Sequence, residues 1–241
     1  MLGQTLGQLE ELVRGDSPAW VVQVGSVALW LGIVGGLAWW LYRQPQMEAE
    51  FVRKTVHIGT GNIILLAWWL QIPAWMAVVA SIFFGGLALL SYYIPILPGI
   101  NSVGRKSFGT FFYAVSIGIL VAWFWPLHLP QLAVLGILIM TWGDGLAALV
   151  GKRWGQHPYV LWGERKSWEG SGAMLGVSWL VGVLVLGSLG LGWGLTVAIA
   201  LAIALGATAL ESMSKLGIDN LTVPVGSAAL GLLLLSWCQG F

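Results

Sequence analysis

Charged side chains are rare in this chain, and they gather in a few short stretches. The stretch TWGDGLAALVGKRW, residues 141–154, places Asp144 after the apolar run ILIMTW and before LAALV. An unpaired carboxylate in such surroundings would cost several kcal/mol, so a partner is expected. The partner is either a lysine, with Lys152 and Lys166 as candidates for a buried ion pair, or a divalent metal ion in a catalytic site.

An Arg-Lys-hydroxyl motif occurs three times, and each copy precedes small residues and an apolar run. The copies are RKTVHIGT at 53–60, RKSFGT at 105–110 and RKSWEGS at 165–171. We predict that each copy opens a membrane helix, where the Ser or Thr side chain caps free backbone N–H groups. Basic side chains beside helix N-termini bind phosphate oxygens well. The motif therefore indicates a phosphate site, with plain topology signals and ordinary caps as the alternative.

Further carboxylates accompany these basic motifs. Glu169 lies in the third copy, and the stretch ESMSKLGIDN at 211–220 adds Glu211, Asp219 and Asn220. Oxygen ligands next to phosphate-binding cations suit Mg²⁺, which bridges a few carboxylates to nucleotide phosphates. The structural alternative for Asp219 is a helix cap, and for His57 in the first copy it is a packing histidine.

The composition defines the class of protein. The chain has 241 residues, of which 58% are hydrophobic and 9% charged, and its mean hydropathy is +0.84. Sixteen tryptophans and 34 glycines fit interfacial belts and close helix packing in a bilayer. The net charge of +1 gives no reason to expect a nucleic acid partner, and the single Cys238 excludes an internal disulfide. We predict an integral membrane protein.

The apolar runs predict an all-α bundle of seven or eight transmembrane helices, because they are continuous and spanning strands would alternate. The predicted spans are 19–42, 57–71, 73–97, 108–125, 131–150, 172–190, 193–210 and 222–238. Residues 1–18 lack the features of a cleavable signal peptide and are expected to lie at the membrane surface. Residues 19–241 would form a single transmembrane domain.

Basic residues orient this bundle. Under an eight-span topology, ten of the 11 lysines and arginines fall on one face, and only Arg14 lies on the other. The positive-inside rule makes that face cytoplasmic, or stromal in a plastid. The candidate polar groups lie on the same face. Because phosphate loops and dinucleotide motifs are absent from usable contexts, a nucleotide site would have to be built from the ends of membrane helices.

Four stretches carry a family resemblance: RKTVHIGTG, GDGLAALVGKRWG, GERKSWEGSGAM and ESMSKLGIDNLTVP. In this order they resemble the phytol kinase/dolichol kinase family of CTP-dependent polyprenol kinases, over roughly residues 50 to 230. The short chain and the early RKTVH are most similar to phytol and farnesol kinases of cyanobacteria and plastids. The resemblance implies transfer of the CTP γ-phosphoryl group to a long-chain isoprenoid alcohol dissolved in the membrane, with phytol the first choice, as in tocopherol synthesis.

We assign roles on this basis. Asp144 and Asp219 are expected to hold Mg²⁺ on the CTP phosphates. Glu169 and His57 are the candidate general bases. The remaining residues are expected to bind the nucleotide or neutralise developing charge: Arg53, Lys54, Lys152, Arg165, Lys166, Ser167 and Asn220, with Lys166 also acting in catalysis.

Two other functions stay open at this stage. One is a CTP-dependent cytidylyltransferase of the CDP-diacylglycerol synthase type, although KSWEGS stands where such enzymes carry a glycine-histidine run and paired aspartates. The other is an anion or lipid transporter, which would bind its substrate nearer the bilayer midplane. The glycine-rich run GIVGG also leaves a homo-oligomer open.

Overall fold

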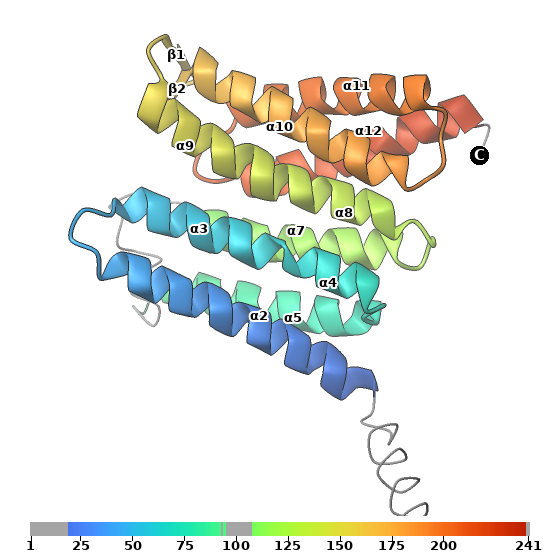
Figure 1. Cartoon of the computed structure of the whole chain (residues 1–241), viewed down its shortest axis with the longest axis horizontal. Coiled ribbons are helices and arrows are strands. Elements are labelled where there is room, and N and C mark those ends of the chain that lie inside the picture. The colour runs from blue at the N-terminus through green and yellow to red at the C-terminus, as the bar shows by residue number, and fades with distance from the viewer. Residues whose placement is uncertain (1–18, 93, 95–107, 240–241) are drawn as a thin grey trace, which may run out of the picture.

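The computed structural model describes residues 19–92, 94 and 108–239, in which long helices run side by side (Figure 1). The elements in chain order are α2 (Ala19–Tyr42), α3 (Ala49–Gly61), α4 (Ile63–Trp69), α5 (Ala74–Ser91), α7 (Gly109–Phe124), α8 (Pro130–Leu138), the π-helical turn η1 (Ile139–Asp144), α9 (Gly145–Trp154), β1 (Pro158–Leu161), β2 (Glu164–Ser167), α10 (Trp168–Gly187), α11 (Trp193–Ser212) and α12 (Asp219–Gln239). The predicted interfacial segment 1–18 lies outside the described residues.

The predicted class, an all-α multi-pass membrane protein, is confirmed. Six helices of the described part are long and apolar enough to cross a membrane: Trp20–Tyr42, Ala74–Ser91, Pro130–Trp154, Trp168–Gly187, Trp193–Ser212 and Asp219–Cys238. Helix α7 is shorter, with 16 residues, and the predicted span 57–71 is divided between α3 and α4. The count of eight crossings therefore stays a prediction.

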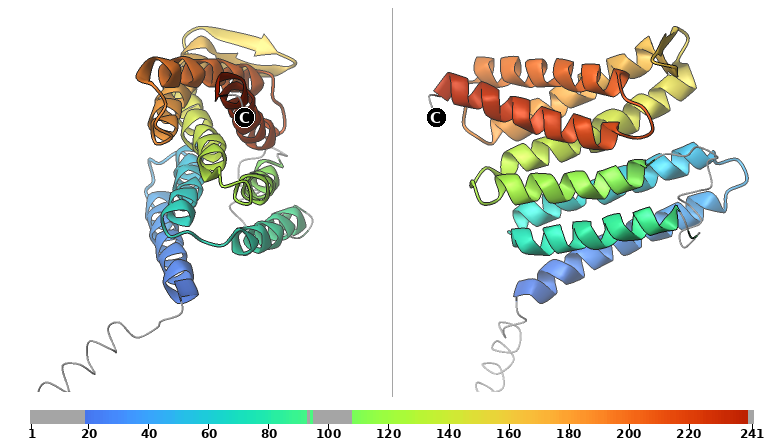
Figure 2. Two further views of the ribbon diagram at one scale, coloured as in Figure 1. Left: turned by 90° about the vertical axis from the view of Figure 1, so that its right-hand side faces the viewer. Right: turned by 180° about the vertical axis from the view of Figure 1, so that it is seen from behind.

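The connections divide between the two ends of the bundle (Figure 2). The α2–α3 turn, the β1–β2 hairpin and the α11–α12 loop lie at one end, whereas the α4–α5, α7–α8 and α10–α11 connections lie at the other. This is the alternation that the basic residues predict. The connection that carries Arg105 and Lys106 lies outside the described residues.

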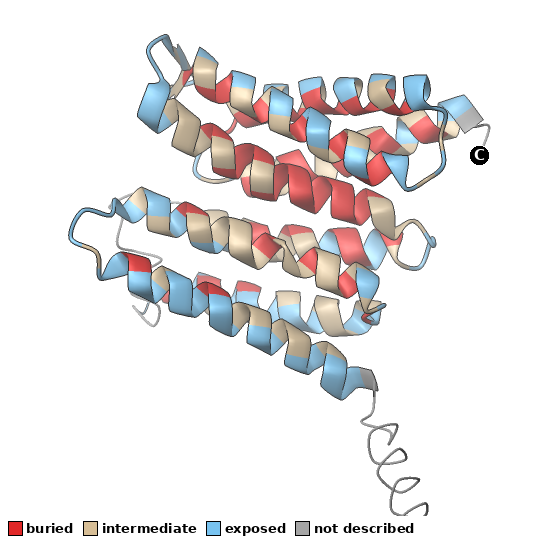
Figure 3. Ribbon diagram, in the orientation of Figure 1, coloured by how far each residue is buried: buried red, intermediate tan, exposed pale blue. Residues whose placement is uncertain are grey.

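The rod formed by α8, η1 and α9 is the centre of the bundle. In its most apolar stretch of 18 residues 72% of the residues are buried, against 11% in the corresponding stretch of α2 (Figure 3). Buried side chains of the rod include Leu132, Leu135, Ile137 and Met140. The outer helices expose large apolar side chains, as expected where lipid covers a surface. Asp144 therefore sits on the most enclosed element of the fold.

Small residues bring other helices close to this rod. A Cβ atom at Gly136 would lie 2.3 Å from the carbonyl oxygen of Pro224, so only glycine permits this approach of α8 to α12. A Cβ atom at Gly61 would lie 1.9 Å from Thr141 Oγ1, which shows how tightly α3 packs on η1. Close packing of this kind is a main source of helix association in bilayers. It holds η1 against α3 and the preceding helix α8 against α12.

The π-helical turn contains the residues IMTWGD and ends at Asp144. A π turn is rare, and it often marks a functional position because the extra residue changes the direction of the following side chains. Here it lies in the middle of a buried rod and is tied to α3, since Trp142 Nε1 donates to Asn62 Oδ1 at 3.0 Å. The sequence prediction of one regular span over 131–150 did not foresee this turn.

One further element was not predicted from the sequence. The segment between the fifth and sixth predicted spans holds an antiparallel hairpin, in which Tyr159 pairs with Lys166 and Val160 with Arg165. Its two-residue turn, Trp162-Gly163, has positive φ at both positions, the conformation that suits a tight hairpin. The chain is therefore not wholly helical, although the strands do not span the membrane.

The first basic motif also differs from its prediction, whereas the third behaves as expected. Arg53 and Lys54 lie inside α3, which begins at Ala49, because helix-forming residues and an Arg53–Glu50 ion pair extend the helix toward its N-terminus. Ser167 caps α10, since its Oγ accepts a hydrogen bond from Gly170 N at 3.1 Å. The first three residues of the second motif, 105–107, lie outside the described residues, and α7 begins at Gly109 within it.

Candidate active site

A cavity of about 920 Å³ opens at the bundle end that carries the hairpin. Its walls come from α3, the start of α7, α9, the hairpin, α10 and the α11–α12 connection. Nine of the predicted site residues line it: Arg53, Lys54, Asp144, Lys152, Arg165, Lys166, Ser167, Asp219 and Asn220. His57 and Glu169 are not among the lining residues. Segments far apart in the sequence thus meet in one place.

Lys54 and Asp144 form a buried ion pair at the base of the cavity. Lys54 Nζ lies 2.6 Å from Asp144 Oδ2 and 3.3 Å from the Asp144 carbonyl oxygen. Only 2% of Lys54 and 7% of Asp144 are exposed. Lys54, rather than Lys152 or Lys166, is therefore the lysine that neutralises this carboxylate. The sequence missed this pairing because it placed the start of the helix at the first basic motif, and a lysine near a helix start would not reach the base of the cavity. The helix instead begins at Ala49.

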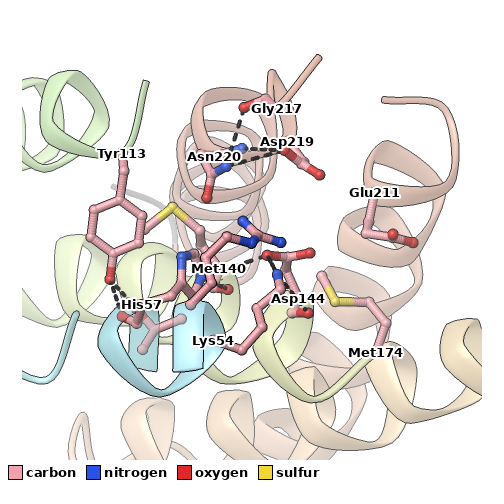
Figure 4. A network of polar contacts seen from close by, with 12 residues as sticks. Lys54, His57, Tyr113, Met140, Asp144, Met174, Glu211, Gly217, Asp219 and Asn220 are labelled. Atoms are coloured by element: carbon pink, nitrogen blue, oxygen red, sulfur yellow. Dashed lines mark hydrogen bonds and ion pairs between the residues drawn. The ribbon is translucent and has the colours of Figure 1, made fainter. Parts of the chain in front are cut away.

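His57 lies on the same face of α3 as Lys54 and holds the π turn (Figure 4). Its Nε2 is 3.2 Å from the Met140 carbonyl oxygen, which can only accept, so this nitrogen carries the proton. Nε2 also lies 3.6 Å from Asp144 Oδ2. Tyr113 packs its ring on His57 at 4.6 Å and donates its hydroxyl to the His57 carbonyl oxygen. These contacts make His57 a positioning group for Asp144.

A second cation–carboxylate pair attaches the hairpin to the bundle. Lys166 on β2 donates to the carboxylate and the carbonyl oxygen of Glu211, which lies at the end of α11. Glu211 is buried and directly follows the apolar run that ends at Leu210, which was the available sequence signal. Lys152 pairs at 2.5 Å with Glu48 in the α2–α3 connection, on the exposed rim.

Glu169 points to a partner outside the cavity. Its carboxylate lies 2.6 Å from His157 Nδ1 and accepts a hydrogen bond from His157 N. Both residues stand beside the hairpin, so this pair fixes the entry to α10. The structure thus gives Glu169 a contact that the sequence did not indicate, while its catalytic role stays a prediction.

The start of α12 supplies an oxygen-rich wall. Asp219 Oδ1 accepts from Asn220 N at 3.0 Å and from Asn220 Nδ2 at 3.3 Å, and Nδ2 also donates to the Gly217 carbonyl oxygen. Figure 4 shows Asp219 and Asn220 on the opposite side of the cluster from Lys54. Among the described carboxylates of the cavity, Asp219 and Glu164 are the two without an ion-pair partner.

Cations on the rim carry unbalanced charge. Within the described part of the chain, Arg165 and Lys215 line the cavity without an ion-pair partner. Arg53 is held by Glu50 at 2.5 Å. Burial alone would raise the pKa of Glu50, but the hydrogen bonds and charge of Arg53 outweigh it and lower that pKa. Lys215 was not among the predicted site residues, although it lines the cavity.

The donor set fits a divalent ion that is bound together with its phosphates. No group of three or more His, Cys, Asp or Glu side chains in the described residues is close enough to hold a metal by itself. Mg²⁺ commonly takes one or two carboxylates and completes its shell with phosphate oxygens and water. Asp144 and Asp219 face one cavity and meet that requirement.

The fold and this cavity define a class: a multi-pass membrane protein with a polar site, rich in cations and carboxylates, at one end of its helices. The chain belongs to the phytol kinase family. It is 50% identical over 227 residues to a phytol kinase of Synechocystis sp., covering 93% of this chain and 94% of that protein. It is 26% identical over 212 residues to phytol kinase 1 of Arabidopsis thaliana, a chloroplastic protein, covering 78% of this chain and 67% of the relative.

A third relative extends this family to a cereal. The probable chloroplastic phytol kinase of Triticum aestivum is 25% identical over 212 residues, which cover 78% of this chain and 68% of that protein. No protein-family model matches the chain, and no solved structure is similar to it.

Removing the charge of Lys54 tests the buried ion pair. Lys54→Met should destabilise the protein by about 3–5 kcal/mol, because it leaves the Asp144 carboxylate buried without a cation. Asp144→Asn added to Lys54→Met should recover much of that loss. Thermal unfolding of the purified protein in detergent measures both effects, with Arg153→Met as the control on an exposed cation. Equal stability of Lys54→Met and wild type, or strictly additive effects, would contradict the pairing.

Proposed function

We propose that this chain is a kinase that transfers the γ-phosphoryl group of CTP to phytol, forming phytyl phosphate and CDP. Membership of the phytol kinase family supports the acceptor and the reaction. The observation that carries the proposal is the cavity itself, in which Asp144, Lys54 and Lys166 come together from three separate segments. CTP as the donor rests on the sequence motifs that resemble polyprenol kinases.

The cations of the cavity suit a triphosphate. Phosphoryl transfer asks the protein mainly for positioning and for neutralisation of the charge on the phosphate oxygens. Arg165 and Lys215, without ion-pair partners among the described residues, would meet the incoming polyanion first. Lys152 and Lys166 each hold one carboxylate and would share their charge with the nucleotide. Lys54 lies deeper, at the buried base of the cavity, and with the exposed Arg53 beside it would neutralise charge that develops during transfer.

Asp144 and Asp219 are the residues that would hold Mg²⁺. The ion supplies charge neutralisation on the phosphates and orients them for in-line attack. Lys54 contacts Oδ2 of Asp144, and His57 fixes the turn that bears it, so the carboxylate is held in place before any ligand arrives. Such preorganisation is what electrostatic catalysis requires.

The hydroxyl proton of the alcohol must leave as the oxygen–phosphorus bond forms and the bond to CDP breaks. His57 and Glu169 stay the predicted proton acceptors. Glu169 would first have to release the His157 ring, whereas His57 could accept the proton only at Nδ1, because its Nε2 already carries a proton and donates to the Met140 carbonyl oxygen. A general base must come within hydrogen-bond reach of the proton that it removes.

The choice of nucleotide and reaction is tested with labelled substrates. Purified protein in detergent, given phytol, Mg²⁺ and γ-labelled CTP, should produce labelled phytyl phosphate and release CDP. ATP, GTP and UTP serve as matched donors, and Asp144→Asn as the inactive control. Transfer of an α-label from CTP to a lipid phosphate would instead identify a cytidylyltransferase, and a preference for ATP would remove CTP as the donor.

We further propose that the cavity faces the cytoplasm of a cyanobacterium or the stroma of a plastid. The cation-rich end of the bundle supports this orientation through the positive-inside rule. CTP is a polyanion that does not cross a bilayer, so its site must open to the compartment that holds it. The chloroplastic relatives fit the same placement.

Cysteine labelling tests this orientation. In a Cys238→Ser background, Gln156→Cys at the hairpin end should react with a membrane-impermeant thiol reagent only from the cytoplasmic side. Leu127→Cys, in the α7–α8 connection, should react only from the opposite side. Both native residues are exposed, so accessibility does not differ between the two positions. Reaction of both cysteines from one side would overturn the predicted topology.

A further inference from the structure

One buried oxygen in the cavity lacks a hydrogen-bond donor among the residues that the structure describes. Asn220 is 7% exposed, and its Oδ1 has no partner within residues 19–92, 94 and 108–239. The orientation of the amide is fixed by its neighbours, because Nδ2 donates to the Asp219 carboxylate and the Gly217 carbonyl oxygen, which can only accept. Leaving a buried acceptor unsatisfied costs about 1–3 kcal/mol, so a ligand that brings a donor would gain by binding here.

The chemistry around Asn220 selects the kind of donor. Asp219 is adjacent, so this wall of the cavity presents oxygen atoms, and Figure 4 shows Asn220 Oδ1 pointing toward the side on which His57 and Lys54 lie. Phosphate oxygens are acceptors and would be repelled by these oxygens, except where the proposed Mg²⁺ on Asp219 lies between them. Arg165 and Lys166 belong to the hairpin wall, where phosphates are favoured. The cavity thus has an acceptor-rich wall that suits an uncharged group with an O–H.

An apolar lip borders this wall. Phe108, Leu216 and Ile218 expose their side chains at the same end of the bundle, and Phe108 N donates to the Leu216 carbonyl oxygen at 3.0 Å. Leu216 is 60% exposed, lines the cavity and has a φ of 54°, which a bulky residue rarely adopts. Strain of this kind persists where the surrounding structure requires it, often at binding sites. Gly217, with a φ of 83°, continues the turn into Asp219.

We propose that Asn220 and this lip form the acceptor-alcohol subsite, which rests on the kinase function proposed above. The hydroxyl of the isoprenoid alcohol donates to Asn220 Oδ1, and its first apolar carbons lie over Leu216 and Ile218 as the chain leaves toward the lipid. An amphiphilic alcohol matches both parts of this subsite. Its hydroxyl suits the unpaired Asn220 Oδ1, and its apolar carbons suit the apolar lip. Asn220 then binds the alcohol, whereas the sequence predicted that it binds the nucleotide.

Steady-state kinetics on the full-length protein separate the substrates. Asn220→Leu should raise the KM for phytol about tenfold, the loss of one hydrogen bond, and leave the KM for CTP and the Mg²⁺ requirement unchanged. Leu216→Ser should raise the KM for phytol several-fold and leave the KM for CTP unchanged. Leu233→Ser is the matched control, because Leu233 lies on α12 and is 66% exposed, far along the helix from Asn220.

A substrate analogue tests the hydrogen bond directly. The methyl ether of phytol has no O–H, so it should inhibit wild type more weakly than the phytol KM predicts, and this difference should vanish in Asn220→Leu. A raised KM for CTP in Asn220→Leu would assign the residue to the nucleotide, and a raised Mg²⁺ requirement would make it a metal ligand; either result overturns the subsite. If the Asn220→Leu variant does not fold, the Leu216→Ser variant tests the proposal instead. An unchanged KM for phytol in Leu216→Ser would show that the apolar lip does not bind the alcohol. Failure of the proposed function looks different, because wild type itself would form no phytyl phosphate.

Discussion

The ion pair between Lys54 and Asp144 is the contact on which the arrangement of the site depends. Both side chains are buried, and removing either charge would leave the other without compensation in an apolar interior. The pair joins α3 to the central rod where the π turn ends, and His57 and Tyr113 reinforce that junction. Because Lys54 satisfies Oδ2 of Asp144, the carboxylate can stay ionised deep in the bundle and still face the cavity. Under the proposed kinase function, a carboxylate held in this way would bind a metal ion and phosphates without rearrangement of the helices.

The cavity separates two kinds of ligand by chemistry. The hairpin wall presents Arg165 and Lys166 and suits phosphate oxygens, whereas the start of α12 presents Asp219 and Asn220 and suits donors. Asp144 lies between α3 and these walls. Two substrates of opposite character, a water-soluble polyanion and a membrane-dissolved alcohol, can therefore approach the same carboxylate from different directions. The apolar lip at Phe108 and Leu216 places the second approach at the edge of the bundle, where lipid would stand.

The sequence was sufficient for the membrane class and for most of the residues that meet in the cavity, because hydropathy and the clustering of charge are properties of the chain itself. It was insufficient for the pairing of charges. Lys54 reaches Asp144 only because α3 begins at Ala49 and Gly61 lets α3 approach Thr141, and neither fact has a strong local signal. The π turn and the hairpin likewise depend on packing against neighbours. Glu169 shows that a residue type suited to catalysis does not fix the position of its side chain. Although Glu169 lies in a basic motif, its carboxylate contacts His157 beside the cavity.

A structure of the purified protein with a non-hydrolysable CTP analogue and Mn²⁺ in place of Mg²⁺ would test the central claim most directly. The account predicts Mn²⁺ anomalous signal at coordination distance from Asp144 and Asp219, with Lys54 still on Asp144 and the phosphates against Arg165, Lys166 and Lys215. Asn220 Oδ1 would make no contact with the metal ion or the phosphates. Mn²⁺ bound away from Asp144, or a triphosphate that lies outside the cavity, would contradict it.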